Sequence, residues 1–559
     1  MGVYMAMPKR RFRAFLFTIS AAAALTACVP STPAEPSEHM EREGDEVLPL
    51  EKTEIRAGIA KVKITPIEDF NISSYTTVLC KVPEDIRDDI YAQALVMESG
   101  QKRIVYVSAE IAFLIEGITV SGGFRSRIAD AVGAHEDDVF LAATHNHQAP
   151  DKLTYREEQL IIDAAIEASK SLQSVKMGIT TVPCPYGVSR SPSYNISYTA
   201  PYDNTLVLVR LDTYDDEPLG LIYSYPLHNT MIGNLYHENR NLLSCEFTGF
   251  ASRYLEEQLK KQNPGAIVMF MTGLTGNSGP LYDGQYSLQY EEVKKAGQEL
   301  GKFVHDAYNE IETKPLCGDI SGSFSVIPLR INQDEQFVLQ HGSGYKDMKI
   351  YCTALEDLAI VGVGAEVFNI TGAHLRAEAP FRYVISTSSV NGWCGYLPTY
   401  ETFHSGMHEE ECQPYKTPFS DETEAVFYDA LINELCALAG LKIDARTAAQ
   451  MTDITHGDMS AVYEYEFQKT IKADKLVIDC GQASRADCPE DFTLQLMDDS
   501  GIVVFSQTYE NNSVNYIGAF IDGIDFSKAK IIVATSYQSI KEIEALPISL
   551  YAIVFSPIQ

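Results

Sequence analysis

Basic residues are scarce in this chain, which carries 44 Lys and Arg against 76 Asp and Glu, a formal net charge of −32. Proteins that bind nucleic acid draw much of their affinity from Lys and Arg on phosphates, so this balance excludes a nucleic-acid partner. It also argues against binding to anionic lipid through a basic patch. Beyond the N-terminal segment, no apolar run is long enough to cross a bilayer.

Cys-x-x-Cys pairs are absent from the 11 cysteines, which excludes a structural zinc framework of the zinc-finger kind. Cys480 and Cys488 are the cysteines closest together in the sequence, but disulfide connectivity does not follow from spacing. Any zinc site in this chain is therefore expected to use other ligands.

The N-terminus has the pattern of an export signal. Lys9-Arg10-Arg11 precedes an apolar stretch, Ala14 to Leu25, and the small residues that follow suit a cleavage site. The ending Leu25-Thr26-Ala27-Cys28 resembles the lipobox of bacterial lipoproteins, which implies a lipid anchor on Cys28. We expect a signal peptide over 1–27, a Pro-, Glu- and Ser-rich tether over 28–52, and an exported protein anchored on the cell surface or the periplasmic side. Ordinary cleavage and release is the alternative.

The remaining chain is long enough for two domains. Over 53–445, short apolar runs alternate with amphipathic stretches, which predicts a mixed α/β catalytic domain with flanking helices. Over 453–559, β-type runs separated by turn residues predict a small all-β, immunoglobulin-like sandwich. The expected strands are 103–114, 138–145, 204–211, 219–228, 266–272 and 358–367, and the expected helices are 157–172 and 246–259.

The most informative motif is Thr144-His145-Asn146-His147, which follows the apolar run 138–143. Side chains on a strand alternate between faces, so a strand through His145 would direct His145 and His147 the same way. Paired imidazoles where a strand ends suit a metal or a catalytic role, although two unrelated histidines would show the same spacing.

Other polar segments lie in apolar contexts, namely 226–230, 273–280, 362–366 and 391–399. Taken singly, His228 is an ordinary strand-end histidine and Glu366 an ordinary turn carboxylate. Trp393 suits packing beside the turn before Tyr396, or the lining of a lipid pocket.

In this order the segments resemble the neutral/alkaline (non-lysosomal) ceramidase family over roughly residues 55 to 420. The resemblance lies in the opening Ala57-Gly58-Ile59-Ala60-Lys61-Val62-Lys63-Ile64-Thr65-Pro66, in Thr144-His145-Asn146-His147, Ser189-Arg190-Ser191-Pro192, Leu227-His228-Asn229-Thr230, Gly364-Ala365-Glu366 and Gly395-Tyr396-Leu397-Pro398-Thr399. Together these motifs are far more specific than any one of them.

The resemblance implies one zinc ion per chain, bound by His145, His228, Glu366 and Tyr396, with a coordination position left for water. It also implies that His147 is the general acid/base or the hydrogen-bonding partner of the tetrahedral intermediate. Arg190 would hold the substrate's polar group or help stabilise negative charge. Zinc lowers the pKa of a bound water, so an amide bond could be hydrolysed at neutral pH.

Two departures from the family pattern affect the substrate side. Gly279 stands where ceramidases have a serine, and Ser278, one residue earlier, is not assigned as a nucleophile. His408 stands where the family has a second active-site tyrosine, and it could replace that hydroxyl as a donor. Glu246 and Ser189 replace the family's aspartate and asparagine. These changes surround the expected metal ligands without removing them.

We therefore expect a zinc amidohydrolase that cleaves an N-acyl amide, with a ceramide-like lipid as the family default. The alternatives are a zinc hydrolase of another amide or ester, and a catalytically silent surface binding lipoprotein of the same fold. The sequence leaves open the oligomeric state and whether a calcium or magnesium ion also supports the fold.

Overall fold

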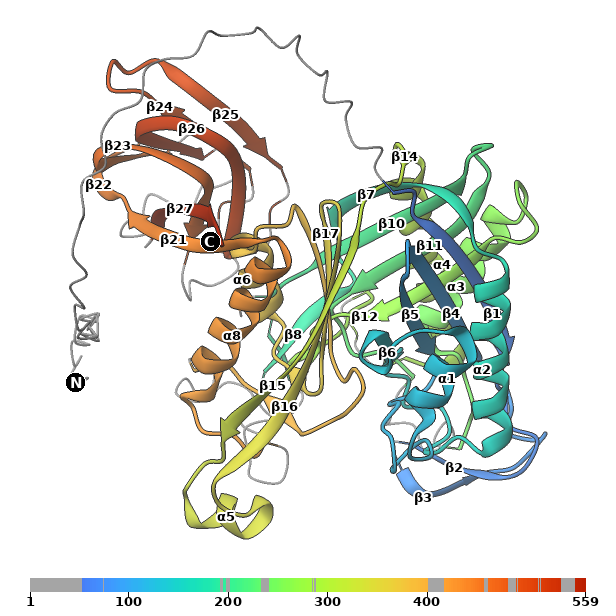
Figure 1. Cartoon of the computed structure of the whole chain (residues 1–559). Helices are drawn as coiled ribbons and strands as arrows, with labels where there is room; N and C mark the ends of the chain where they lie inside the picture. Colours follow the sequence, from blue (N-terminus) through green and yellow to red (C-terminus); the bar gives the residue numbers. More distant parts are fainter. Residues whose placement is uncertain are drawn as a thin grey trace, which may run out of the picture. The chain divides into compact units, whose positions relative to one another are not determined.

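A computed structural model describes most of the chain from residue 53 to residue 558 (Figure 1). The described stretches are 53–73, 75–191, 195–197, 202–232, 241–283, 285, 288–400, 417–456, 461–480, 489, 491–510, 512, 514–533 and 548–558. The predicted signal peptide, Cys28, the tether and His408 lie outside them. The described residues belong to one compact unit, and none of their helices has both the length and the apolar character needed to span a membrane.

The largest sheet contains nine strands among the described residues. Its path, from one edge to the other, is β12 (Ile267–Thr272), β11 (Pro218–Tyr225), β10 (Thr205–Thr213), β7 (Gln173–Pro183), β1 (Arg56–Lys63), β4 (Tyr91–Ser99), β5 (Lys102–Ala109) and β6 (Val139–Ala143), with β14 (Lys314–Pro315) beside β7. Every residue of β6 and β11 is buried, which is why these segments are apolar throughout rather than alternating.

Both edges of this sheet are parallel pairs, β5 with β6 and β11 with β12, whereas the strands between them are antiparallel. Parallel pairs need a crossover, and the chain supplies α1 (Phe124–Val132) before β6 and α3 (Glu246–Leu259) before β12. The sheet curves until β12 contacts β5 and β6, and Ser108 Oγ donates to the carbonyl of Phe270 at 2.6 Å. This closure brings the chain after β6 near the chain after β11.

Helices cover this sheet, and a second sheet packs against it. α2 (Tyr155–Lys170) contacts β1 and β4, and α4 (Tyr290–Asn309) contacts α3. The second sheet runs in the order β15 (Ile320–Arg330), β16 (Tyr345–Leu355), β17 (Leu358–Val363) and β19 (Tyr383–Thr387). One apolar cluster joins the two sheets through residues such as Tyr106 and Met269 from the first and Tyr351 and Ile385 from the second.

Shorter elements complete this part of the chain. Figure 1 shows α5 at the tip of the long β15–β16 hairpin. β18 (Glu366–Val367), which comes between β17 and β19, forms a two-stranded parallel pair with β20 (Tyr396–Leu397). Helix α8 (Thr423–Leu438) packs on β15 and β16. The bounds are β2 (Phe70–Ile72), β3 (Tyr75–Cys80), η1 (Glu136–Asp138), β8 (Gly187–Ser191), β9 (Asn195–Ser197), β13 (Ser278–Pro280), α5 (Glu335–His341), β18 (Glu366–Val367), α6 (Ile370–Glu378), β20 (Tyr396–Leu397) and α8 (Thr423–Leu438).

After α8 the chain is entirely β among the described residues. The strands are β21 (Leu441–Ala448), β22 (Gln450–His456), β23 (Ala461–Asp479), β24 (Phe492–Met497), β25 (Val503–Tyr509), β26 (Tyr516–Val533) and β27 (Ser549–Pro557). The pairing of the long strands β23 and β26 shifts register between Glu466 and Ile471. On its other edge, β23 pairs with β22 before this shift and with β27 after it. The predicted mixed α/β architecture with a β-rich C-terminal part is confirmed, and the immunoglobulin-like topology stays a prediction.

Candidate metal centre

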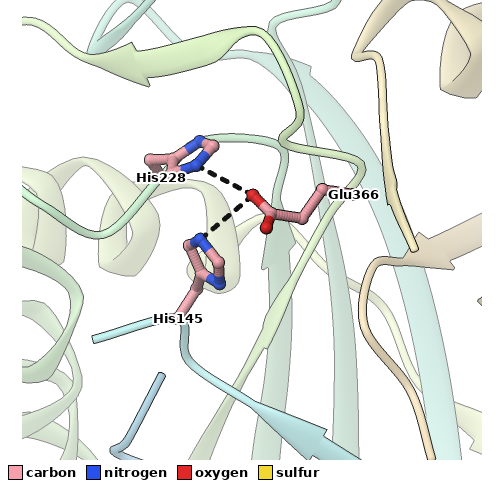
Figure 2. A group of neighbouring side chains, drawn as sticks. All are labelled: His145, His228 and Glu366. Carbon is pink, nitrogen blue, oxygen red and sulfur yellow. Dashed lines mark ion pairs between the residues drawn. The ribbon is translucent and has the colours of Figure 1, made fainter. Parts of the chain in front are cut away.

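Three buried side chains from distant parts of the sequence converge where β6 and β11 end and β18 begins (Figure 2). His145 follows β6 by two residues, His228 follows β11 by three, and Glu366 is the first residue of β18. The Nε2 atoms of His145 and His228 lie 3.4 and 3.1 Å from Oε2 of Glu366. One ligand atom from each residue lies within 4.8 Å of the other two.

The group fits a cation. Oε2 of Glu366 is buried and accepts no hydrogen bond of good geometry from the described residues, although it faces two imidazole nitrogens. A buried carboxylate oxygen with no donor is costly unless a positive charge satisfies it. Two imidazoles and a carboxylate are also a common donor set for zinc. Burial raises the pKa of Glu366, but the charges and hydrogen-bonding groups of His145 and His228 outweigh burial, leaving that pKa well below its usual value.

A loop, not a strand, presents the two histidines of the first motif. Strand β6 ends at Ala143, and His145 has a φ of 59°, in the left-handed region. The strand predicted over 138–145 therefore extends two residues too far at its C-terminal end and one at its start. Strand alternation does not explain the shared direction of the rings. Asn146 fixes the loop instead: its Nδ2 donates to the carbonyl of Ser244 at 2.7 Å, and its Oδ1 accepts from the backbone N–H of Gln148 at 2.8 Å.

His147 lies beside the cluster. Its Nε2 is 3.3 Å from Nε2 of His145, and the two ring centroids are 4.8 Å apart. The ring of His147 is half-buried, whereas the rings of His145 and His228 are buried. His147 therefore has the more open position of the three imidazoles, next to a ligand rather than turned away from it.

Tyr396 is placed by pairing with the carboxylate strand. β18 and β20 are parallel, with Glu366 in register with Tyr396, and the N–H of Glu366 donates to the carbonyl of Gly395 at 3.0 Å. Gly276 passes close behind this pair, because a Cβ there would lie 2.6 Å from the carbonyl oxygen of Glu366. The register puts the backbone of Tyr396 next to that of Glu366, and the role of Tyr396 as a ligand stays a prediction.

Trp393 makes a contact that the sequence did not reveal. Its Nε1–H donates to Oε1 of Glu366 at 2.8 Å, so the indole and the two imidazoles face different oxygens of one carboxylate. The only available signal was that this is the chain's single tryptophan and that it lies three residues before the predicted ligand Tyr396.

The remaining predicted site residues are only partly placed. The backbone of Arg190 lies in β8, whose Ser189 pairs with Ser278 of β13, but the Arg190 side chain is outside the description. Ser278 is fully buried, and its Oγ contacts the carbonyls of Pro226, at 2.9 Å, and Thr275, at 3.1 Å. That hydroxyl ties the segment leading to His228 to the turn before β13, which is a structural role.

Two buried polar residues behind the cluster hold its segments in place. Asn369 Nδ2 donates to the carbonyls of Asp203 and Pro226, each at 3.0 Å, and its backbone N–H donates to Oδ1 of Asn277 at 2.8 Å. Glu246 accepts from the N–H groups of Met231, Ile232 and Phe247. Burial raises the pKa of Glu246 to about 7, although these three N–H groups lower it. The sequence predicted neither of these roles, because no local pattern marks a residue that bonds several distant segments.

Comparisons with known proteins were made by sequence and by structure, and no family model matches the chain. Neutral ceramidase of Pseudomonas aeruginosa is 21% identical over 318 residues, which are 49% of this chain and 46% of that relative. The match thus spans about half the length of the relative.

Solved structures match over more of the chain. The crystal structure of neutral ceramidase from Pseudomonas aeruginosa has a TM-score of 0.54, and a ceramidase complexed with C2 has a TM-score of 0.55. Each is 14% identical, and each match covers 91% of this chain and 99% of the other. These matches confirm the resemblance to the neutral ceramidase family that the motifs predict, and they show that the chain has the neutral ceramidase fold.

Proposed function

We propose that this protein is a zinc-dependent amidohydrolase that cleaves the N-acyl amide bond of a ceramide-like lipid. The observation that carries the proposal is the buried group of His145, His228 and Glu366, whose ligand atoms lie within 4.8 Å of one another. The neutral ceramidase fold around this group supports the reaction class. The resemblance of the site motifs supports the substrate class.

In this proposal His145, His228 and Glu366 hold the ion, and Tyr396 completes the ligand set. Zinc supplies Lewis-acid chemistry, which activates a water molecule and polarises the amide carbonyl. His147 lies within reach of the same centre, and it would take the proton that the attacking water loses and pass it to the leaving amine nitrogen. Arg190 holds the polar group of the substrate. Because His147 faces the ligand histidine, the geometry favours a hydrolase over a silent binding protein of the same fold.

A second candidate is a hydrolase of a different amide or an ester. It is favoured by Gly279, which stands in place of the family's serine, and by His408, which stands in place of its tyrosine. These exchanges leave the described ligand group intact, so they affect the choice of substrate rather than the reaction type.

The test combines metal content with substrate turnover on the purified chain. We expect one zinc per chain and zinc-dependent release of fatty acid from a ceramide in preference to a panel of N-acyl amino acids. His145→Ala and Glu366→Ala should lose both zinc and turnover, whereas the matched control His135→Ala, at an exposed histidine, should keep both. Turnover of the panel alone would favour the second candidate, and full turnover without metal would overturn the proposal.

We also propose that the chain is an exported lipoprotein anchored through Cys28, on the strength of the sequence Leu25-Thr26-Ala27-Cys28. In the same scheme residues 53–445 form the catalytic domain, and residues 453–559 form an immunoglobulin-like sandwich that braces it. The hydrogen bonds from Lys475 of β23 to the carbonyls of Arg376 and Ala379 of α6 support the bracing role.

A further inference from the structure

Trp393 lies in the loop between β19 and β20, and this loop is fixed along the strand that leads to His145. Asn391 Nδ2 donates to the carbonyl of Val139 at 2.9 Å, and its Oδ1 accepts from the N–H of Leu141 at 2.8 Å. The N–H of Cys394 donates to the carbonyl of Gly364 at 2.9 Å. The loop is therefore held on both sides of Trp393, so the indole is presented by a rigid backbone.

The two oxygens of the Glu366 carboxylate have different partners. The Nε1–H of Trp393 donates to Oε1 at 2.8 Å, while Oε2 faces His145 and His228. With Oε1 held, rotation of the carboxylate away from the two imidazoles would break a hydrogen bond to an ionised group, which is among the stronger kinds. The side chain of Trp393 is 40% exposed, so water could have satisfied its N–H, yet the N–H is directed at the buried carboxylate.

Phe113 links the indole to a second ligand of the group. Its ring meets the ring of His145 edge-on, with centroids 5.0 Å apart, and lies 5.9 Å from the indole. Aromatic rings at such distances attract each other beyond the area that they bury. Packing on Phe113 thus orients both the imidazole of His145 and the indole that holds Glu366.

We propose that Trp393 is a positioning residue that presets Glu366 for the metal ion, a role that the metal-ligand motifs do not include. The inference rests on the metal binding of the proposed function but not on the identity of the substrate. Hydrogen bonds to metal ligands fix ligand orientation, and their loss typically lowers metal affinity about 10- to 100-fold. A tryptophan that only packs against the loop would show no such effect.

The experiment exploits the fact that the chain has one tryptophan. Biosynthetic replacement by 3-benzothienylalanine keeps the bicyclic shape of Trp393 and removes only the N–H, whereas 5-fluorotryptophan keeps the N–H and serves as the matched control. Zinc affinity is measured by competition with a chromogenic chelator. We expect a loss of about 10- to 100-fold with benzothienylalanine, wild-type affinity with 5-fluorotryptophan, and an unchanged thermal midpoint for the metal-free protein.

Indole fluorescence gives a second readout, independent of turnover. Because Trp393 bonds the carboxylate that faces the cation, zinc should change its emission in wild type and not in His145→Ala. Trp393→Phe should show the same loss of zinc affinity as the benzothienyl protein. Unchanged zinc affinity in both the benzothienyl protein and Trp393→Phe would overturn this inference and leave the proposed function standing. Zinc binding without hydrolysis would contradict the proposed function but leave this inference standing, and a wild-type chain that binds no zinc would overturn both.

Discussion

At the scale of single residues, His147 and His145 are neighbours with different expected roles. Nε2 of His147 lies 3.3 Å from Nε2 of His145, but only His145 also faces Glu366. We expect His147→Ala to keep its zinc and lose about 10²- to 10⁴-fold in kcat, the usual contribution of a general acid/base. His145→Ala should instead lose the zinc. Zinc content and turnover measured on the same preparations decide the matter, and loss of zinc in His147→Ala would contradict the assignment.

The same residues show how far the sequence alone could go. The spacing of His145 and His147 predicted that the two rings point the same way, and their Nε2 atoms lie 3.3 Å apart. The stated reason was wrong, because a buried asparagine and a left-handed φ at His145 orient the loop after β6 has ended. The contact between Trp393 and Glu366 was missed, since a hydrogen bond between a loop residue and a strand residue 27 positions apart leaves no periodic signal.

At the scale of elements, Asn369 joins three segments that carry or precede site residues. Its side chain bonds the carbonyls before β10 and after β11, and its backbone bonds Asn277 before β13. Asn369→Ala would leave buried polar groups unpaired, so we expect the free energy of unfolding to fall by about 1–3 kcal/mol. Asn263→Ala is the control: this half-buried asparagine donates to the carbonyl of Pro218 at 3.1 Å and accepts from the N–H of the nearby Gly265 at 2.9 Å. Equal losses in the two variants, measured by denaturant titration, would contradict a special role for Asn369.

The C-terminal end of helix α6 is bonded by a lysine from the β-rich part of the chain. The Nζ of Lys475 donates to the carbonyls of Arg376 and Ala379 at 2.9 and 2.8 Å, and burial lowers the pKa of Lys475 from 10.5 to about 7. Between these two values the unfolded chain binds a proton that the folded chain has released. The contribution of this residue to stability therefore rises with pH from about 7 towards 10.5.

Lys475→Met tests this linkage by removing the titrating group. Denaturant unfolding at several pH values should show wild-type stability rising relative to the variant, with a difference in slope approaching about 1.4 kcal/mol per pH unit. Because other groups titrate equally in both proteins, the difference isolates Lys475. Parallel curves across this range would mean that the buried lysine keeps its proton in the folded state.

At the scale of the whole molecule, the β-type runs predicted from about residue 453 agree with an all-β end of the described chain, although the last described helix ends earlier, at Leu438, and β21 begins at Leu441. Helix α3 has the predicted bounds, Glu246–Leu259. The closure of the nine-stranded sheet, which brings β12 against β6, was not predicted, because strand order depends on long-range pairing rather than on local pattern. Without the family resemblance, nothing local would have joined His145, His228 and Glu366 into one group.

The attachment of the whole molecule to a membrane is expected to depend on one atom, the sulfur of Cys28. The chain is strongly acidic, at −32, so anionic lipid would repel it rather than hold it. Stable anchoring then requires lipid chains, and one acyl chain alone binds only marginally.

We expect Cys28→Ala to move the protein from the membrane pellet to the soluble fraction of fractionated cells. Turnover of a soluble short-chain N-acyl substrate should be unchanged, because the site residues lie between His145 and His408. A variant that still sediments with membranes would show that another part of the chain makes the attachment.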